Sequence, residues 1–194
     1  MKYALFGDSH SQAVFPIVSE SLNRLGNEVI AKSKAGWTLK KHLEDGMESI
    51  IASFNPDVLV LSLGGNNQDL SDGYQQQIDR VLALVKRYGI KRVIWVSPAW
   101  AIRSDVQVRH EWTTNFLKKN LPRKIELIDI RPITKTGHRS DGVHFESSKY
   151  REWAELVSKH LLTKNAITLI PRWTWGVSTL IVILGLGISV LKRK

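Results

Sequence analysis

The chain has 194 residues, of which 43% are hydrophobic and 24% charged, and this composition excludes a disordered tail, a collagen-like fibre and a low-complexity linker. It contains no cysteine, which excludes disulfides, thiolate catalysis, iron–sulfur clusters and cysteine-ligated zinc. The formal net charge is +10, but half of it comes from residues 164–194 and the other basic residues are scattered, so we expect a solvated basic surface and no nucleic-acid partner.

Short apolar runs alternate with amphipathic segments in the first 163 residues. Strands are predicted at residues 3–6, 28–31, 58–63, 92–97 and 125–130. Helices are predicted from apolar stripes within residues 14–25, 39–51, 78–85 and 153–161. Continuous apolar strands that alternate with amphipathic helices indicate a parallel sheet covered on both faces. The fold class predicted for residues 1–163 is therefore a three-layer α/β/α sandwich with a central parallel sheet.

The C-terminal segment has a different character. A linker at 164–172 leads to residues 173–191, which carry no charge and as a helix would span about 28 Å. Tryptophans near its start and the basic tail 192–194 suit the two interfaces of a bilayer. We therefore predict one C-terminal transmembrane helix, the alternative being a buried core helix. Because the N-terminus shows no signal peptide, we expect the anchored domain to face the cytoplasm or to belong to a viral membrane.

Two polar groupings at predicted loop positions suggest acid–base chemistry. Ser9 follows the first strand on a glycine turn that leads into a helix, which exposes its hydroxyl above the sheet. Asp141 stands three residues before His144, in the loop before the last helix, where the carboxylate can orient the imidazole as a general base. The alternatives are that Ser9 only caps its helix, and that Asp141 and His144 are ordinary loop and surface residues.

Two further positions could stabilise a developing oxyanion. Asn66, after the third strand, can aim its side-chain amide there, and Gly36, after the second strand, can offer its backbone N–H. An Asx turn at Asn66 and an ordinary turn at Gly36 are the simpler alternatives.

Taken together, these residues resemble the SGNH (GDSL-type) hydrolase family. The family's blocks correspond here to Gly7-Asp8-Ser9, Gly36, Gly64-Gly65-Asn66-Asn67 and Asp141-Gly142-Val143-His144, in the same order and at the same strand ends. The resemblance covers nearly all of residues 1–163 and implies the flavodoxin-like SGNH hydrolase fold.

The resemblance also implies a role for each matching residue. Ser9 would be the nucleophile, His144 its general base and Asp141 the group that orients His144. The backbone N–H groups of Ser9 and Gly36 and the side-chain amide of Asn66 would form the oxyanion hole. The reaction would pass through an acyl-enzyme, with no metal and no cofactor.

Three neighbouring residues are expected to support the site. Asp8 would brace the turn before the nucleophile. His10 stands where the family's name has leucine, which is similar to SGNH domains associated with polysaccharide O-acylation and deacylation, and it would line the substrate or support the structure. Asn67 replaces an aspartate that is often present in the third block.

Two tryptophans could meet the substrate. Trp37 and Trp100 follow strands beside the expected cleft and could stack on sugar faces, or could pack beneath the loops. The polar segment 101–112 could form a lid over the cleft.

The predicted function is that of a membrane-anchored serine esterase. It would remove a small acyl group, acetyl above all, from a small ester or an envelope glycan. The alternatives are an O-acyltransferase on the same site, a lysophospholipase or thioesterase, and a non-catalytic membrane or virion scaffold.

Overall fold

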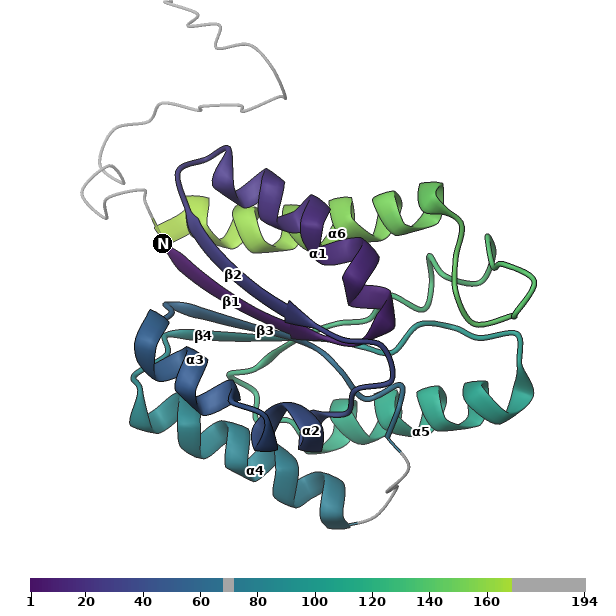
Figure 1. Ribbon diagram of the computed structural model, residues 1–194, viewed down its shortest axis with the longest axis horizontal. Coiled ribbons are helices and arrows are strands. Elements are labelled where there is room, and N and C mark those ends of the chain that lie inside the picture. The colour runs from purple at the N-terminus through teal and green to yellow at the C-terminus, as the bar shows by residue number, and fades with distance from the viewer. Residues whose placement is uncertain (68–71, 169–194) are drawn as a thin grey trace, which may run out of the picture.

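The computed structural model describes residues 1–67 and 72–168, which form a parallel sheet covered by helices on both faces (Figure 1). The strands are β1 (Lys2–Gly7), β2 (Glu28–Ser33), β3 (Val58–Ser62), β4 (Arg92–Val96) and β5 (Glu126–Ile128). Their order is β2-β1-β3-β4-β5, and each neighbouring pair is parallel. The expectation of a central parallel sheet is confirmed, and all the carboxyl ends of the strands meet at one edge.

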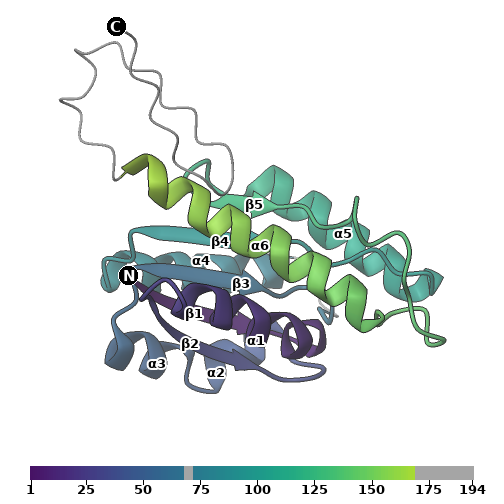
Figure 2. The ribbon, with the colours of Figure 1, turned by 90° about the horizontal axis from the view of Figure 1, so that it is seen from above.

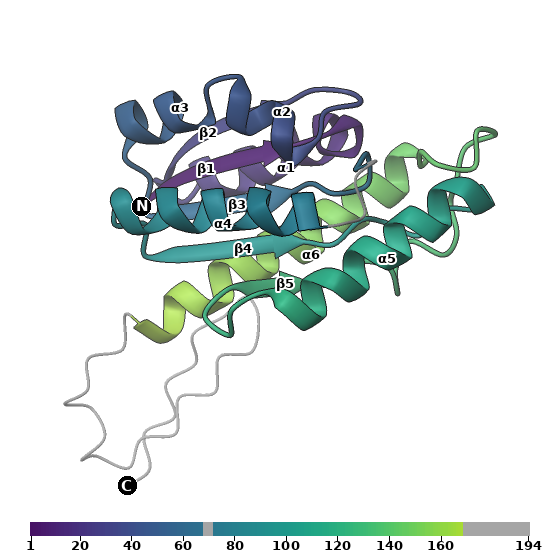
Figure 3. The same ribbon diagram turned by 90° about the horizontal axis from the view of Figure 1, so that it is seen from below.

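The helices divide between the two faces of the sheet. They are α1 (Ser9–Asn23), α2 (Leu39–Glu44), α3 (Met47–Phe54), α4 (Asp72–Arg87), α5 (Ser104–Asn120) and α6 (Ser147–Thr168). Helices α1 and α6 cover one face, which Figure 2 shows from above, and α2 to α5 cover the other, which Figure 3 shows from below. The three layers expected from the alternation of apolar runs and amphipathic segments are therefore present.

Successive residues of the central strands enter two separate cores. In β1, Tyr3 and Leu5 belong to the core under α1 and α6, whereas Ala4 and Phe6 belong to the core over α2 to α5. Because side chains alternate across a strand, a strand buried on both faces must be apolar at every position. This explains why the central strands β1, β3 and β4 are almost continuous apolar runs in the sequence.

Two of the sequence-based predictions about helices need correction. The stripe between residues 39 and 51 forms two helices, because the chain turns at Asp45 and Gly46, where Gly46 takes a φ of +88° that favours glycine. The segment that begins at Ser104, which we expected only as part of a polar lid, is the start of the long helix α5.

The last helix runs further than the predicted domain boundary. It continues to Thr168, so its final turns occupy the first residues of the predicted linker 164–172. Within the described ranges, the structure contains no helix of the length and apolarity needed to cross a bilayer. The predicted membrane-spanning segment 173–191 and the basic tail 192–194 lie outside those ranges.

Candidate active site

Ser9 is placed by the abrupt passage from β1 into α1. The carboxylate of Asp8 caps the helix by accepting a hydrogen bond from the backbone N–H of His10 at 3.1 Å. Gly7 allows the helix to begin so close to the strand, since a Cβ there would lie 2.0 Å from the Ser11 hydroxyl. Ser9 therefore stands at the first helical position, where its own backbone N–H is not needed within the helix.

The hydroxyl of Ser9 meets a histidine that comes from the far end of the domain. His144 Nε2 lies 3.0 Å from Ser9 Oγ, and His144 Nδ1 lies 2.8 Å from Asp141 Oδ2. A carboxylate only accepts, so Nδ1 carries the proton, and Nε2 is left to accept the proton of the serine. The structure thus brings together Ser9, His144 and Asp141, although 135 positions separate the serine from the histidine.

Asp141 is fixed as an anion by its own loop. Its Oδ1 accepts the backbone N–H groups of Val143 and His144, both at 2.8 Å. These two backbone donors, followed by the His144 side chain, hold the pKa of Asp141 well below its usual range. The carboxylate therefore stays charged at neutral pH and can stabilise a positive charge on the imidazole.

The site is open to solvent. The side chains of His144 and Asp141 are 37% and 47% exposed, respectively. Water can reach the imidazole and the serine without any movement of the chain.

Beneath the triad lies a second, buried histidine. His10 is buried, its Nδ1 lies 3.1 Å from the hydroxyl of Tyr150, and its ring centre lies 5.1 Å from that of His144. Burial lowers the pKa of His10 to about 3, whereas burial raises the pKa of Asp8 to about 6. His10 is therefore neutral near pH 7 and supports the floor of the site without acting as a charged group.

The expected oxyanion donors differ in their relation to the cavity. Asn66 lines it and uses one amide hydrogen on the backbone carbonyl of Trp37 at 3.2 Å, with no acceptor for the second hydrogen among the described residues. Gly36 lies in the exposed turn after β2 with a φ of +72°. In the described part of the chain, Gly36 is not one of the lining residues, so its role stays a prediction.

The remaining expected residues lie around the cavity and not on its wall. Asn67 is buried, and its side-chain nitrogen has no hydrogen-bond partner among the residues described. Trp37 packs edge-on against His42 with 4.8 Å between ring centres, and the backbone N–H of Trp100 donates to Thr134 Oγ1 at 2.9 Å. Sugar stacking by either tryptophan stays a prediction.

The triad opens into a cavity of about 240 Å³. Helix α5 and the residue before it supply one wall, through Arg103, Val106, Arg109 and His110. These four residues were not singled out in the sequence. Their spacing of three and four positions in the sequence, which is typical of residues that share one face of a helix, could have indicated this wall.

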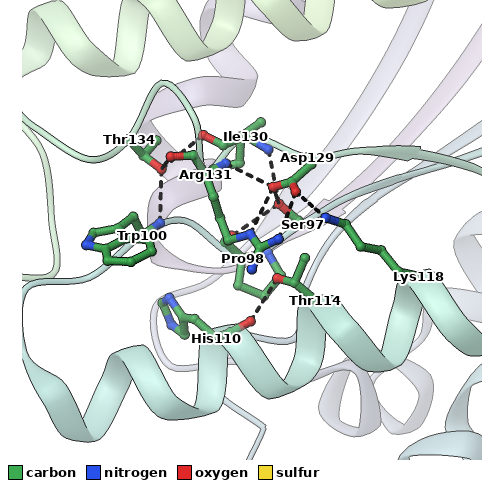
Figure 4. Close-up of polar contacts among 10 residues, drawn as sticks. All are labelled: Ser97, Pro98, Trp100, His110, Thr114, Lys118, Asp129, Ile130, Arg131 and Thr134. Atoms are coloured by element: carbon green, nitrogen blue, oxygen red, sulfur yellow. Dashed lines mark hydrogen bonds and ion pairs between the residues drawn. The ribbon is translucent and has the colours of Figure 1, made fainter.

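A network of polar contacts joins the two loops that surround the site (Figure 4). Ser97 Oγ, after β4, accepts the backbone N–H of Ile130, after β5, at 3.1 Å. Asp129 accepts the Arg131 guanidinium at 2.9 and 3.0 Å and Lys118 Nζ at 2.7 Å. The network holds the start of the segment that leads to Asp141 and His144.

Replacing Asp129 with asparagine is expected to lower the free energy of unfolding by roughly 1–3 kcal/mol, because the half-buried Arg131 loses its charged partner. The Arg131 side chain and then Lys118 hold the pKa of Asp129 well below its usual value of 3.8. Since the pKa is lower in the folded state, this stabilisation is present above pH 3.8 and is lost as the pH falls further.

Urea unfolding of both proteins at neutral and at acidic pH measures this effect. Asp79→Asn, on the exposed face of α4, is the matched control. A difference between wild type and Asp129→Asn that does not shrink in acid would contradict the assignment.

The fold of the domain is similar to that of several solved structures. No family model and no curated protein sequence matches the chain. Among solved structures, the acetyl xylan esterase AlAXEase is 22% identical with a TM-score of 0.65, covering 84% of this chain and 100% of its own. A carbohydrate esterase family 3 protein from Talaromyces cellulolyticus is 16% identical with a TM-score of 0.66, covering 86% of this chain and 99% of its own.

A lipase/acylhydrolase from Enterococcus faecalis is also similar, at 18% identity and a TM-score of 0.61, covering 82% of this chain and 94% of its own. The domain described here therefore has the α/β fold that these esterases and acylhydrolases share. Within the described ranges, no group of three or more potential metal-ligating side chains is present.

Proposed function

We propose that the protein is a serine esterase of the SGNH type that removes a small acyl group, acetyl above all, from an ester. The observation that carries this proposal is the 3.0 Å approach of His144 Nε2 to Ser9 Oγ, with Asp141 on the other ring nitrogen. The similarity in fold to enzymes named as acetyl xylan and carbohydrate esterases supports it.

The reaction begins with attack by the serine. Ser9 Oγ bonds to the carbonyl carbon of the ester while its proton moves to His144 Nε2, and Asp141 stabilises the resulting imidazolium. The carbonyl oxygen becomes an oxyanion, which the backbone N–H of Ser9 and the amide of Asn66 stabilise. Collapse breaks the bond to the alcohol, which leaves with the proton from His144, and the acyl group stays on Ser9.

Water completes the cycle by the same steps. His144 takes a proton from water, whose oxygen attacks the acyl-serine, and the proton then returns to Ser9 as the acid departs. Because His144 and Asp141 are exposed to solvent, water can reach the acyl-serine. This favours hydrolysis over transfer of the acyl group to a sugar hydroxyl.

The size of the cavity favours a small acyl group. Its volume of about 240 Å³ is below the ~300–1,000 Å³ typical of pockets for drug-sized ligands. Acetyl esters of small molecules or of an envelope glycan are therefore the proposed substrates. Attachment of the domain to a membrane through residues 173–191, on the cytoplasmic side or in a viral membrane, is part of the same proposal and is supported by the sequence alone.

Labelling with a fluorophosphonate probe tests the nucleophile directly. The full chain is expected to gain one probe per molecule, on Ser9, because the neighbouring imidazole activates this hydroxyl. Mass spectrometry of the digested protein locates the label, and Ser9→Ala is the control. Equal labelling of wild type and Ser9→Ala would remove Ser9 as the nucleophile.

A further inference from the structure

One wall of the cavity carries two arginines. Arg109 and Val106 belong to α5, Arg103 precedes the helix as its N-cap residue, and all three line the cavity. A substrate bound at Ser9 therefore lies in a cavity that both arginines line. The two arginines differ in what they already bind.

Arg103 is already paired within its own turn. Its Nε and Nη2 donate to the two carboxylate oxygens of Asp105 at 3.1 and 2.6 Å. Arg109, which is half-buried, makes no hydrogen bond and no close ion pair in the described part of the chain, although its charge acts on Asp105 from a greater distance. Its five N–H donors are therefore available to a ligand.

Among the described residues, the carboxylates nearest to the cavity cannot pair with Arg109 without giving up their present donors. Asp105 is bound by Arg103, and Asp141 holds two backbone N–H groups and His144 Nδ1. Asp8 is buried and caps α1. A guanidinium on the wall of a cavity, with the described acids around it already engaged, matches an anionic group of the ligand.

His110, next to Arg109, does not compete for that anion. Its Nδ1 lies 2.7 Å from the backbone carbonyl of Ala99, and burial lowers its pKa, so the ring is neutral. Arg109 is therefore the charged group that this part of the wall offers.

We propose that Arg109 binds an anionic group of the substrate, so that the enzyme prefers acylated acidic molecules to acylated neutral ones. This inference rests on the proposed esterase function and specifies its substrate class. The anion can be a carboxylate, as on an acidic sugar, or a phosphate, and both accept the planar two-donor edge of a guanidinium.

Three acetyl esters of similar shape test the proposal on the full-length protein: 4-acetoxybenzoate, 4-acetoxyphenyl phosphate and the neutral 4-acetoxybenzamide. The measured quantity is the ratio of kcat/KM for each anionic ester to that for the amide. In Arg109→Gln this ratio is expected to fall roughly 10- to 100-fold for the anion that Arg109 binds. Because the same esters are compared in wild type and variant, differences in their intrinsic reactivity cancel.

Two further variants make the result specific. Arg109→Lys keeps the charge but loses the two-donor edge, so a smaller fall is expected. Arg80→Gln removes the same charge from the exposed face of α4 and is expected to leave the ratio unchanged. Circular dichroism confirms that each variant is folded.

The outcomes separate the two proposals. A fall confined to the benzoate or to the phosphate identifies which anion is bound, and either supports the inference. Equal ratios in wild type and Arg109→Gln, with hydrolysis intact, overturn the role of Arg109 alone. Absence of Ser9-dependent hydrolysis of all three esters overturns the esterase function and this inference together.

Discussion

Replacing Ser9 with alanine is expected to lower kcat/KM for 4-nitrophenyl acetate by at least about 10³-fold, because the acyl-serine intermediate can no longer form. His144 and Asp141 remain in place in this variant, so the loss reports the nucleophile alone. Release of 4-nitrophenol, followed by absorbance with purified full-length protein, measures it.

The matched control for this prediction is Ser148→Ala. Ser148 is exposed at the start of α6 and does not line the cavity, so the variant is expected to hydrolyse the ester like the wild type. Hydrolysis by folded Ser9→Ala at more than a tenth of the wild-type rate would show that the reaction does not pass through this serine.

Replacing Asp141 with asparagine is expected to lower kcat/KM by roughly 10²- to 10⁴-fold. The asparagine oxygen can still accept the backbone N–H groups of Val143 and His144, so the loop keeps its shape. The amide nitrogen then faces His144 Nδ1 and donates to it, which places the ring proton on Nε2. In that tautomer the imidazole cannot accept the proton of Ser9.

Asp79→Asn, on the exposed face of α4, controls for the loss of one negative charge and is expected to change the rate less than twofold. The pKa of Asp141 is held low, so protonation of this group does not account for any loss of activity near neutral pH. Near wild-type hydrolysis by Asp141→Asn would rule out orientation of His144 by this carboxylate.

The sheet and the three triad residues could be predicted from the sequence for one common reason. Strands buried on both faces must be apolar throughout, so the polar residues that follow them stand out, as Ser9 does after β1. The carboxyl ends of parallel strands share one edge, so residues far apart in sequence could be expected to meet there. The contact between Ser9 and His144 agrees with that expectation.

Helix α5 and the cavity wall that it forms could not be predicted in the same way. Its buried face includes His110, Thr113 and Thr114, polar residues whose side chains bond to backbone carbonyls of Ala99, Gly64 and the helix itself. The apolar stripe that marks an amphipathic helix is therefore interrupted, and the segment looks like a polar loop. The spacing of its residues shows which of them share a face, but the position of Arg109 on the cavity follows from the three-dimensional path of the helix.

The break between α2 and α3 could not be predicted because the apolar stripe continues across it. Leu39, Leu43, Met47 and Ile51 keep a helical spacing across it, although the backbone turns at Gly46. Periodicity shows which side chains share a face, but it does not show where the backbone stops being helical.

Helix α6 determines where the rest of the chain leaves the domain. It starts just after the loop of His144 and, with 22 residues, runs about 33 Å back along the sheet. Near its end, the carbonyls of His160 and Leu161 accept the guanidinium of Arg92, at the first position of β4. The described chain thus ends at Thr168 on the side of the domain remote from Ser9, so the proposed membrane attachment would be made away from the mouth of the cavity.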